Sequence, residues 1–200
     1  MSINITAGAL SLALLFSGGQ AATAPNVFVN QAVAVATTAS IETTAGSAIE
    51  EAKQYLKYMT FSRQGLIDQL ASSHGSGFSE DEATSAVEQL EADGLVDWNA
   101  EALEAASSFI EQKAFSRQGL LNQLTSSYGS QFTLKEATAA VDYLEENELV
   151  DWNAEAVEAA KSFSDITSLT KQDLYNQLTS KQSAGFTKAQ AEYALKELGY

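Results

Sequence analysis

Cysteine is absent from the 200-residue sequence, and proline occurs once, at Pro25. The lack of cysteine excludes disulfide bonds, thiolate metal sites, cysteine nucleophiles and lipid attachment through a cysteine in the chain as given. Proline interrupts helices because it has no backbone N–H and its ring clashes with the preceding turn. Since Pro25 lies near the N-terminus, the rest of the chain can form helices, weakened only by one glycine in each of two of them, Gly65 and Gly119.

Basic residues are also scarce. The chain has 11 Lys and Arg against 26 Asp and Glu, which gives a formal net charge of −15. Such a chain repels nucleic acid and anionic lipid headgroups, so its natural partners are neutral or basic surfaces. Residues 153–200 carry six acidic and five basic side chains and are nearly neutral. We therefore expect the acidic surface to lie in residues 49–152.

The N-terminal segment has no charged side chain before Glu42. Its apolar run from Ala7 to Phe16 is shorter than the roughly 20 residues that cross a bilayer. It suits the apolar core of a secretory signal, although no Lys or Arg precedes it. We interpret residues 1–36 as a signal-like apolar segment and residues 37–46 as a flexible linker. This predicts an exported protein, secreted or at the cell surface, with membrane contact only if the segment stays uncleaved. The alternative is an apolar tail on a cytoplasmic protein.

Internal repeats dominate the rest of the sequence. The motif FSRQGL begins at Phe61 and again at Phe115, and LVDWNAEA begins at Leu95 and again at Leu149. Both pairs are 54 residues apart, and a diverged third copy, with Leu169 in place of the phenylalanine, follows without a gap. We expect three tandem repeats, at residues 47–98, 99–152 and 153–200, the last of them truncated.

Each copy has the pattern of three helices, because its apolar residues recur at helical spacing. The second helix opens after a good N-cap residue, and the third opens with a capping box, in which an N-cap hydroxyl and a Glu or Gln three residues later bind each other's backbone. A short polar turn joins these two helices, which gives a helix-turn-helix outline. The predicted fold is therefore all-α, built from three tandem three-helix repeats with a 54-residue period. The expected N-caps are Ser62, Ser116 and Thr170, and the expected capping boxes are Ser79 with Glu82, Thr133 with Glu136 and Thr187 with Gln190.

Equivalent apolar positions of the copies are expected to form their cores. Trp98 and Trp152, just before the first helix of the next copy, are either aromatic anchors for a partner or staples between consecutive copies. We favour staples, because the copy with no following repeat lacks the tryptophan segment. The expected core comprises Phe61, Leu66, Leu70, Phe78, Val87, Leu90, Trp98, Phe115, Leu120, Leu124, Phe132, Val141, Leu144, Trp152, Leu174, Leu178, Phe186, Leu195 and Leu198.

Two groups of polar residues are candidates for contact with a partner. The first, at helix N-termini where a positive charge opposes the helix dipole, indicates either a contact site or pairing with nearby carboxylates. The second is the acidic set of the second copy, which predicts binding of a basic partner; the alternative is a solvated face. The first group is Arg63, Gln64, Arg117 and Gln118, and the second is Glu136, Asp142, Glu145, Glu146, Glu148 and Asp151.

Catalytic and nucleic-acid-binding functions are disfavoured. The sequence has no phosphate loop, zinc pattern, nucleophile elbow or calcium-loop spacing. Its single histidine, His74, is replaced by Tyr128 and Gln182 in the other copies, so neither a metal site nor a catalytic base depends on it. A DNA-reading helix-turn-helix needs a basic recognition helix, whereas the third helix, SEDEATSAVEQLEADG from Ser79, is acidic. We expect no enzymatic activity, no metal, no cofactor and no nucleic-acid partner.

The segment FSRQGLIDQLASSHGSGFSEDEATSAVEQL, from Phe61 to Leu90, and its copy from Phe115 to Leu144 resemble the host cell surface-exposed lipoprotein family. The resemblance extends over residues 49–200. It implies tandem helix-turn-helix repeats outside the cell membrane of Gram-positive bacteria. Phage-encoded members of that family act in superinfection exclusion: they block DNA injection by engaging a protein of the incoming phage's tail. The family is typically anchored through a lipobox cysteine, which this chain lacks.

These observations lead to one main hypothesis and two alternatives. The main hypothesis is an exported cell-surface protein-binding module, whose acidic face meets a basic or amphipathic helical partner such as a phage tail component, so that DNA injection is blocked. The first alternative is an envelope-associated protein that binds a host factor unrelated to phage. The second is an intracellular helix-turn-helix regulator.

Overall fold

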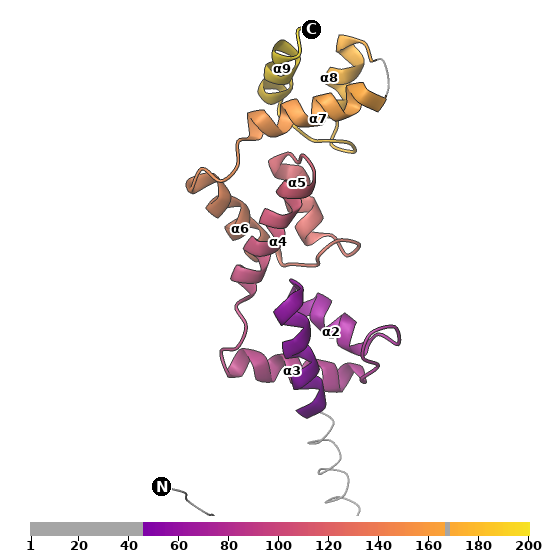
Figure 1. Ribbon diagram of the computed structural model, residues 1–200, viewed down its shortest axis with the longest axis vertical. Coiled ribbons are helices and arrows are strands. Elements are labelled where there is room, and N and C mark those ends of the chain that lie inside the picture. The colour runs from indigo at the N-terminus through magenta and orange to yellow at the C-terminus, as the bar shows by residue number, and fades with distance from the viewer. Residues whose placement is uncertain (1–45, 167–168) are drawn as a thin grey trace, which may run out of the picture. The chain divides into compact units, whose positions relative to one another are not determined.

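The computed structural model describes residues 46–166 and 169–200, and all of their regular secondary structure is helical (Figure 1). This confirms the predicted all-α class. The signal-like segment 1–36 and the linker 37–46 lie outside the described residues, except residue 46, which is already helical. All described residues belong to one compact unit. No described helix combines the length and the apolarity that a membrane crossing requires.

The described helices repeat with the predicted 54-residue step. Repeat one contains the helical residues 46–58 and the helices α2 and α3, repeat two contains α4, α5 and α6, and repeat three contains α7, α8 and α9. Their bounds are α2 Arg63–Ala71, α3 Glu80–Ala92, α4 Trp98–Gln112, α5 Arg117–Thr125, α6 Leu134–Glu146, α7 Trp152–Ile166, α8 Lys171–Thr179 and α9 Lys188–Glu197.

Side-chain caps define the helix starts, because the first backbone N–H groups of a helix have no partner within it. The three predicted N-caps of the second helices and the three predicted capping boxes are confirmed. The first helix of repeat two differs from the expectation that it follows Trp98 directly. It begins one residue earlier, at Trp98, because the Asp97 carboxylate caps it by accepting hydrogen bonds from the backbone N–H groups of Asn99 and Ala100.

Each repeat has its own hydrophobic core, assembled from leucine and alanine side chains of its three helices. In repeat one, for example, Leu66 and Leu70 of α2 pack against Val87 and Leu90 of α3 and are fully buried. Truncating such a leucine to alanine typically costs about 2–5 kcal/mol. Most of the expected core residues are buried, whereas Phe61, Phe78, Trp98, Trp152 and Leu198 are only half-buried.

Two turn positions in each of the first two repeats have a left-handed backbone. In the turn between the second and third helices this position is Gly77 in repeat one, Gln131 in repeat two and Gly185 in repeat three. After the third helix it is Gly94 in repeat one and Glu148 in repeat two. Repeat two therefore places non-glycine residues, at φ 59° and 55°, where its neighbours have glycine.

Candidate protein-binding surface

Both candidate arginines form hydrogen bonds and ion pairs with carboxylates of their own repeats. Arg63 Nε donates to Glu91 Oε1 at 2.9 Å, and Trp98 Nε1 donates to the same oxygen at 2.8 Å. A second carboxylate, that of Glu88, lies 3.7 Å from Arg63 Nη2. Trp98 is the first residue of α4, yet its ring packs against the core of repeat one. It thus links the two repeats.

Repeat two reproduces this arrangement at the equivalent residues. Arg117 Nε donates to Glu145 Oε1 at 3.0 Å, Trp152 Nε1 donates to the same oxygen at 2.6 Å, and Arg117 Nη2 also binds Asp142. Partial burial lowers the pKa of Arg117, but the two carboxylates raise it by more, so it lies above its ordinary value. The arginine is therefore held charged between two carboxylates, and its role as a partner contact stays a prediction.

The glutamines that follow these arginines are exposed. Gln64 donates to Asp68 Oδ1 at 2.7 Å and Gln118 donates to Asn122 Oδ1 at 2.9 Å, one helical turn further along. Such bonds between exposed side chains break easily, so both amides are accessible to a partner.

The six acidic candidates of repeat two fall into two classes. Four of them are used inside the chain: Glu136 closes the capping box of α6, Asp151 accepts from the Asn153 and Ala154 backbone N–H groups, and Asp142 and Glu145 bind Arg117. Glu146 and Glu148 are exposed and have no internal partner among the described residues. Only these two carboxylates are fully available to a partner.

Two apolar side chains that the sequence reasoning missed flank these free carboxylates. Tyr143 is 47% exposed and Leu149 is 57% exposed. Together with Glu146 and Glu148 they form a mixed acidic and apolar surface at the end of α6, here called the α6 end patch. Tyr143 replaces Gln89 of repeat one, and this change to an aromatic residue is the signal that could have found it.

Glutamates on the first helix of a following repeat bind the preceding repeat. Glu101 Oε2 accepts from the Phe61 backbone N–H at 3.0 Å, and Glu155 Oε2 accepts from the Phe115 N–H at 2.9 Å. Burial raises the pKa of both carboxyls; the backbone hydrogen bond lowers it, and neighbouring carboxylates raise it further. The sequence reasoning missed this role, although both glutamates lie in the repeated motif LVDWNAEA.

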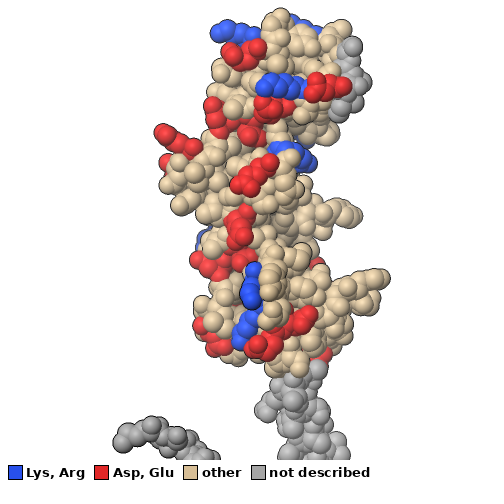
Figure 2. Space-filling view, viewed as in Figure 1, with Lys and Arg blue, Asp and Glu red and all other residues tan. Residues whose placement is uncertain are grey.

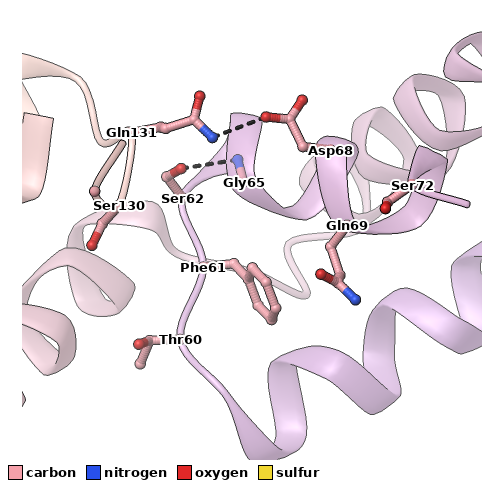
Figure 3. Close-up of a pocket in the computed structure, with 10 residues that line it drawn as sticks. Thr60, Phe61, Ser62, Gly65, Asp68, Gln69, Ser72, Ser130 and Gln131 are labelled. Carbon is pink, nitrogen blue, oxygen red and sulfur yellow. Dashed lines mark hydrogen bonds between the residues drawn. The ribbon is translucent and has the colours of Figure 1, made fainter. Parts of the chain in front are cut away.

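A cleft of about 430 Å³ lies where repeats one and two meet (Figure 3). Gln131 of repeat two reaches toward α2 and donates to Asp68 Oδ2 at 2.9 Å. The Ser62 hydroxyl caps α2 by accepting from the Gly65 N–H. A Cβ at Gly65 would lie only 3.2 Å from that hydroxyl and 3.8 Å from the Ser130 carbonyl of repeat two. The glycine therefore leaves room mainly for the Ser62 cap, and the loop of repeat two lies beside it at an ordinary contact distance.

The fold and the surface together define a class of protein: a tandem array of small helical repeats with a predominantly acidic surface and an exposed acidic and apolar patch. Figure 2 shows the excess of acidic over basic side chains on one face of the molecule. The sequence model described as "host cell surface-exposed lipoprotein" matches three stretches, residues 43–90, 97–144 and 151–198. These stretches make up most of the sequence, so the chain belongs to the host cell surface-exposed lipoprotein family.

Comparison with individual proteins adds one similar structure. The solved structure of Ltp, a superinfection exclusion protein from the Streptococcus thermophilus temperate phage TP-J34, shares 28% sequence identity with this chain. The match covers 49% of this chain and 92% of that one, with a TM-score of 0.42. No curated protein matches significantly.

Proposed function

We propose that this chain is a protein-binding module of the cell surface that excludes further phage by blocking DNA injection through contact with a tail protein. The observation that carries the proposal is the threefold match to the host cell surface-exposed lipoprotein family. The family's description supports a surface location, and the uncharged, apolar start of the sequence is consistent with export. Blocking of DNA injection is the role that the resemblance implies for phage-encoded members.

The α6 end patch has the chemistry that such a contact needs. Aromatic and aliphatic side chains provide most of the binding energy of protein interfaces, and charges around them provide specificity and steering. Tyr143 and Leu149 are exposed apolar groups, and Glu146 and Glu148 are carboxylates without internal partners among the described residues. We expect a partner that offers lysine or arginine beside an apolar face, as a basic amphipathic helix does.

The backbone of Glu148 supports a functional role for this patch. Glu148 occupies the left-handed position that ends α6, whereas repeat one has Gly94 at the equivalent position. The left-handed conformation costs a non-glycine residue about 1–2 kcal/mol. Strain of this kind persists where the side chain has a use, and here it presents a free carboxylate next to Leu149.

A phage challenge tests the proposal. The full-length gene is expressed in a sensitive Gram-positive strain, and adsorption of phage and appearance of phage DNA inside the cells are measured separately. Normal adsorption with blocked DNA entry is the expected result. Unchanged DNA entry for every phage tested, with the protein present at the surface, would overturn the proposal and favour a host factor as the partner. Recovery of the protein in the cytoplasm with Met1 intact would overturn the surface location itself.

Charge reversal identifies the surface involved. The variant Glu146→Lys/Glu148→Lys should restore DNA entry, because it turns the α6 end patch basic. Its control, Glu111→Lys/Glu197→Lys, makes the same change in net charge at two exposed residues outside the patch and should still exclude phage. Loss of exclusion in both variants would show that the change in net charge alone abolishes exclusion. The α6 end patch would then not be the contact.

A further inference from the structure

A second inter-repeat cleft, between repeats two and three, differs from the first in size and in charge. It has a volume of about 650 Å³, against about 430 Å³ for the cleft between repeats one and two. Both values lie within the range of about 300–1,000 Å³ that small-molecule sites occupy. The lining residues that matter here are Lys113, Phe115, Asn122, Ser126, Phe163 and Lys181.

The lining of this cleft is positively charged. Lys113 and Lys181 both line it, and none of its lining residues is acidic. Neither lysine has an ion-pair partner among the described residues, and Lys113 Nζ lies 4.5 Å from the centre of the Phe115 ring. The carboxylate of Glu155, which accepts from the Phe115 N–H, is partly buried and does not line the cleft. In a chain of net charge −15, two unpaired lysines around one cleft form a local positive site.

Equivalent positions of the repeats show why the two clefts differ. In the first cleft the Gln131 side chain bridges to Asp68. The equivalent residues around the second cleft are Gly185, which has no side chain, and the neutral Asn122. The side-chain bridge is therefore absent, the carboxylate is replaced by an amide, and the Ser116 hydroxyl donates to the Ala184 carbonyl across this boundary instead. The positions of Lys113 and Lys181 correspond to the uncharged Met59 and Ser127, so the charge of the cleft changes from negative to positive.

The remaining lining residues indicate the class of ligand. Ser126, Ser162 and Ser183 bring hydroxyl groups, and Asn122, Gln123 and Gln182 bring amides, so the walls both donate and accept hydrogen bonds. The half-buried ring of Phe163 offers an apolar surface among them. Lysine ammonium groups form strong charge-assisted hydrogen bonds with phosphate and carboxylate oxygens. A sugar that carries a phosphate or carboxylate would bind the hydroxyl and amide groups, the Phe163 ring and the lysines together.

We propose that the cleft between repeats two and three binds an anionic carbohydrate. The sugar hydroxyls bind the serine and amide side chains, a sugar face packs against Phe163, and the anionic group lies between Lys113 and Lys181. The inference goes beyond phage exclusion and does not depend on it, because it concerns a different surface from the α6 end patch.

Binding to the full-length chain can be measured by NMR titration of backbone amide signals with three probes: glucose 6-phosphate, glucose and inorganic phosphate. Glucose 6-phosphate should shift the signals of Asn122, Ser126 and Phe163 and should bind about tenfold more tightly than either other probe, since each of those lacks one set of contacts. No shift of these signals with glucose 6-phosphate would overturn the proposal. Equal binding of inorganic phosphate would also overturn it, because the site would then recognise only an anion.

Matched lysine variants test the role of charge. Lys113→Gln and Lys181→Gln should each weaken binding of glucose 6-phosphate about tenfold, since each removes one charge-assisted contact. Lys161→Gln, at an exposed lysine of α7 that pairs with Glu158 outside the cleft, should bind as the parent does. Unchanged affinity in both cleft variants, with native helical circular dichroism, would contradict the proposal.

Discussion

At the scale of single residues, repeat two contains positions where a side chain is kept at a cost in stability. Gln131 and Glu148 both have a left-handed backbone, and glycine occupies the equivalent turn positions of the neighbouring repeats. Gln131 recovers part of this cost through its hydrogen bond to Asp68, across the boundary with repeat one. Glu148 makes no internal contact of this kind among the described residues, so its cost has no compensation within the fold.

Substitution of Glu148 by glycine should therefore stabilise the protein. Glycine adopts a positive φ without the steric penalty of Cβ, which gives an expected gain of about 1 kcal/mol and a rise in Tm of about 2–4 °C. Thermal unfolding followed by circular dichroism measures it. Glu148→Ala is the control, because it removes the same carboxylate but keeps Cβ, and its Tm should not rise. If Glu148 contacts the phage partner, the glycine variant should be more stable and yet exclude phage less well.

The two half-buried glutamates, Glu101 and Glu155, make stability depend on pH. Because burial raises the pKa of Glu101 and Glu155 in the folded chain, folding favours their protonated forms. The stability they contribute is full below the pKa of the unfolded chain and is lost as pH rises through the folded-state pKa. Glu101→Gln keeps an acceptor oxygen for the Phe61 N–H and removes this titration. The variant should be more stable than the parent at pH 7, and the difference should shrink toward pH 4.

Urea unfolding at the two pH values measures this difference. Glu101→Ala is the control, because it leaves the partly buried Phe61 N–H without its acceptor, which should cost about 1–3 kcal/mol at either pH. A glutamine variant whose advantage over the parent grows as pH falls would contradict the assignment.

At the scale of helices, the most informative feature is the joint between each third helix and the first helix of the next repeat. In repeat two, one oxygen of Glu145 receives hydrogen bonds from both Arg117 and Trp152, so α5, α6 and α7 meet at a single carboxylate. The tryptophan also packs against the core of repeat two. The joint thus combines apolar packing with a charged centre.

Trp152→Phe separates these two contributions. Phenylalanine keeps an apolar ring but cannot donate to Glu145, which should cost about 1 kcal/mol. Arg117→Ala should also lower stability, and the two effects should be coupled by more than about 0.5 kcal/mol in a double-mutant cycle, because both groups bind one oxygen. Chemical denaturation of the four proteins measures the coupling. If Arg117→Ala lowers stability but leaves phage exclusion unchanged, Arg117 is not a partner contact.

The sequence predicted local features of the helices well and long-range contacts poorly. Capping residues such as Ser79 and Thr133 act within four residues of their own position, so their motifs can be recognised in the sequence. The start of α4 was predicted one residue late, because the capping role of Asp97 was overlooked. The bond from the Phe61 N–H to Glu101 joins residues 40 positions apart, and no local pattern encodes it.

The candidate contact residues also depend on long-range contacts that the sequence does not show. A count of acidic residues cannot separate Glu146 and Glu148 from Asp142 and Glu145, because only the fold places the last two beside Arg117. Nor does the sequence show that the tight neighbour of Gly65 and Gly119 is the hydroxyl of the cap in the same repeat, Ser62 or Ser116, at 3.2 Å from a Cβ built on the glycine.

At the scale of the whole molecule, stability is divided among three cores that few contacts connect. Each repeat buries its own hydrophobic cluster, so the array approximates a chain of units with nearest-neighbour coupling. Between repeats two and three the coupling includes the bond from the Phe115 N–H to Glu155 and that from the Ser116 hydroxyl to the Ala184 carbonyl. Whether the repeats unfold together depends on contacts of this kind.

Removal of one coupling contact should therefore make unfolding less cooperative rather than lower stability uniformly. In Glu155→Ala the Phe115 N–H loses its acceptor at the boundary between repeats two and three, at a cost of about 1–3 kcal/mol. Calorimetry of the full-length chain should then show repeat three melting at a lower temperature than the rest, as a second transition or a broadened one. The control is Glu158→Ala on the same helix, whose exposed ion pair with Lys161 contributes about 0–1 kcal/mol and which should leave the transition as sharp as in the parent. A single sharp transition at lower temperature in Glu155→Ala would instead mean that packing alone, including that of Trp152, couples the repeats.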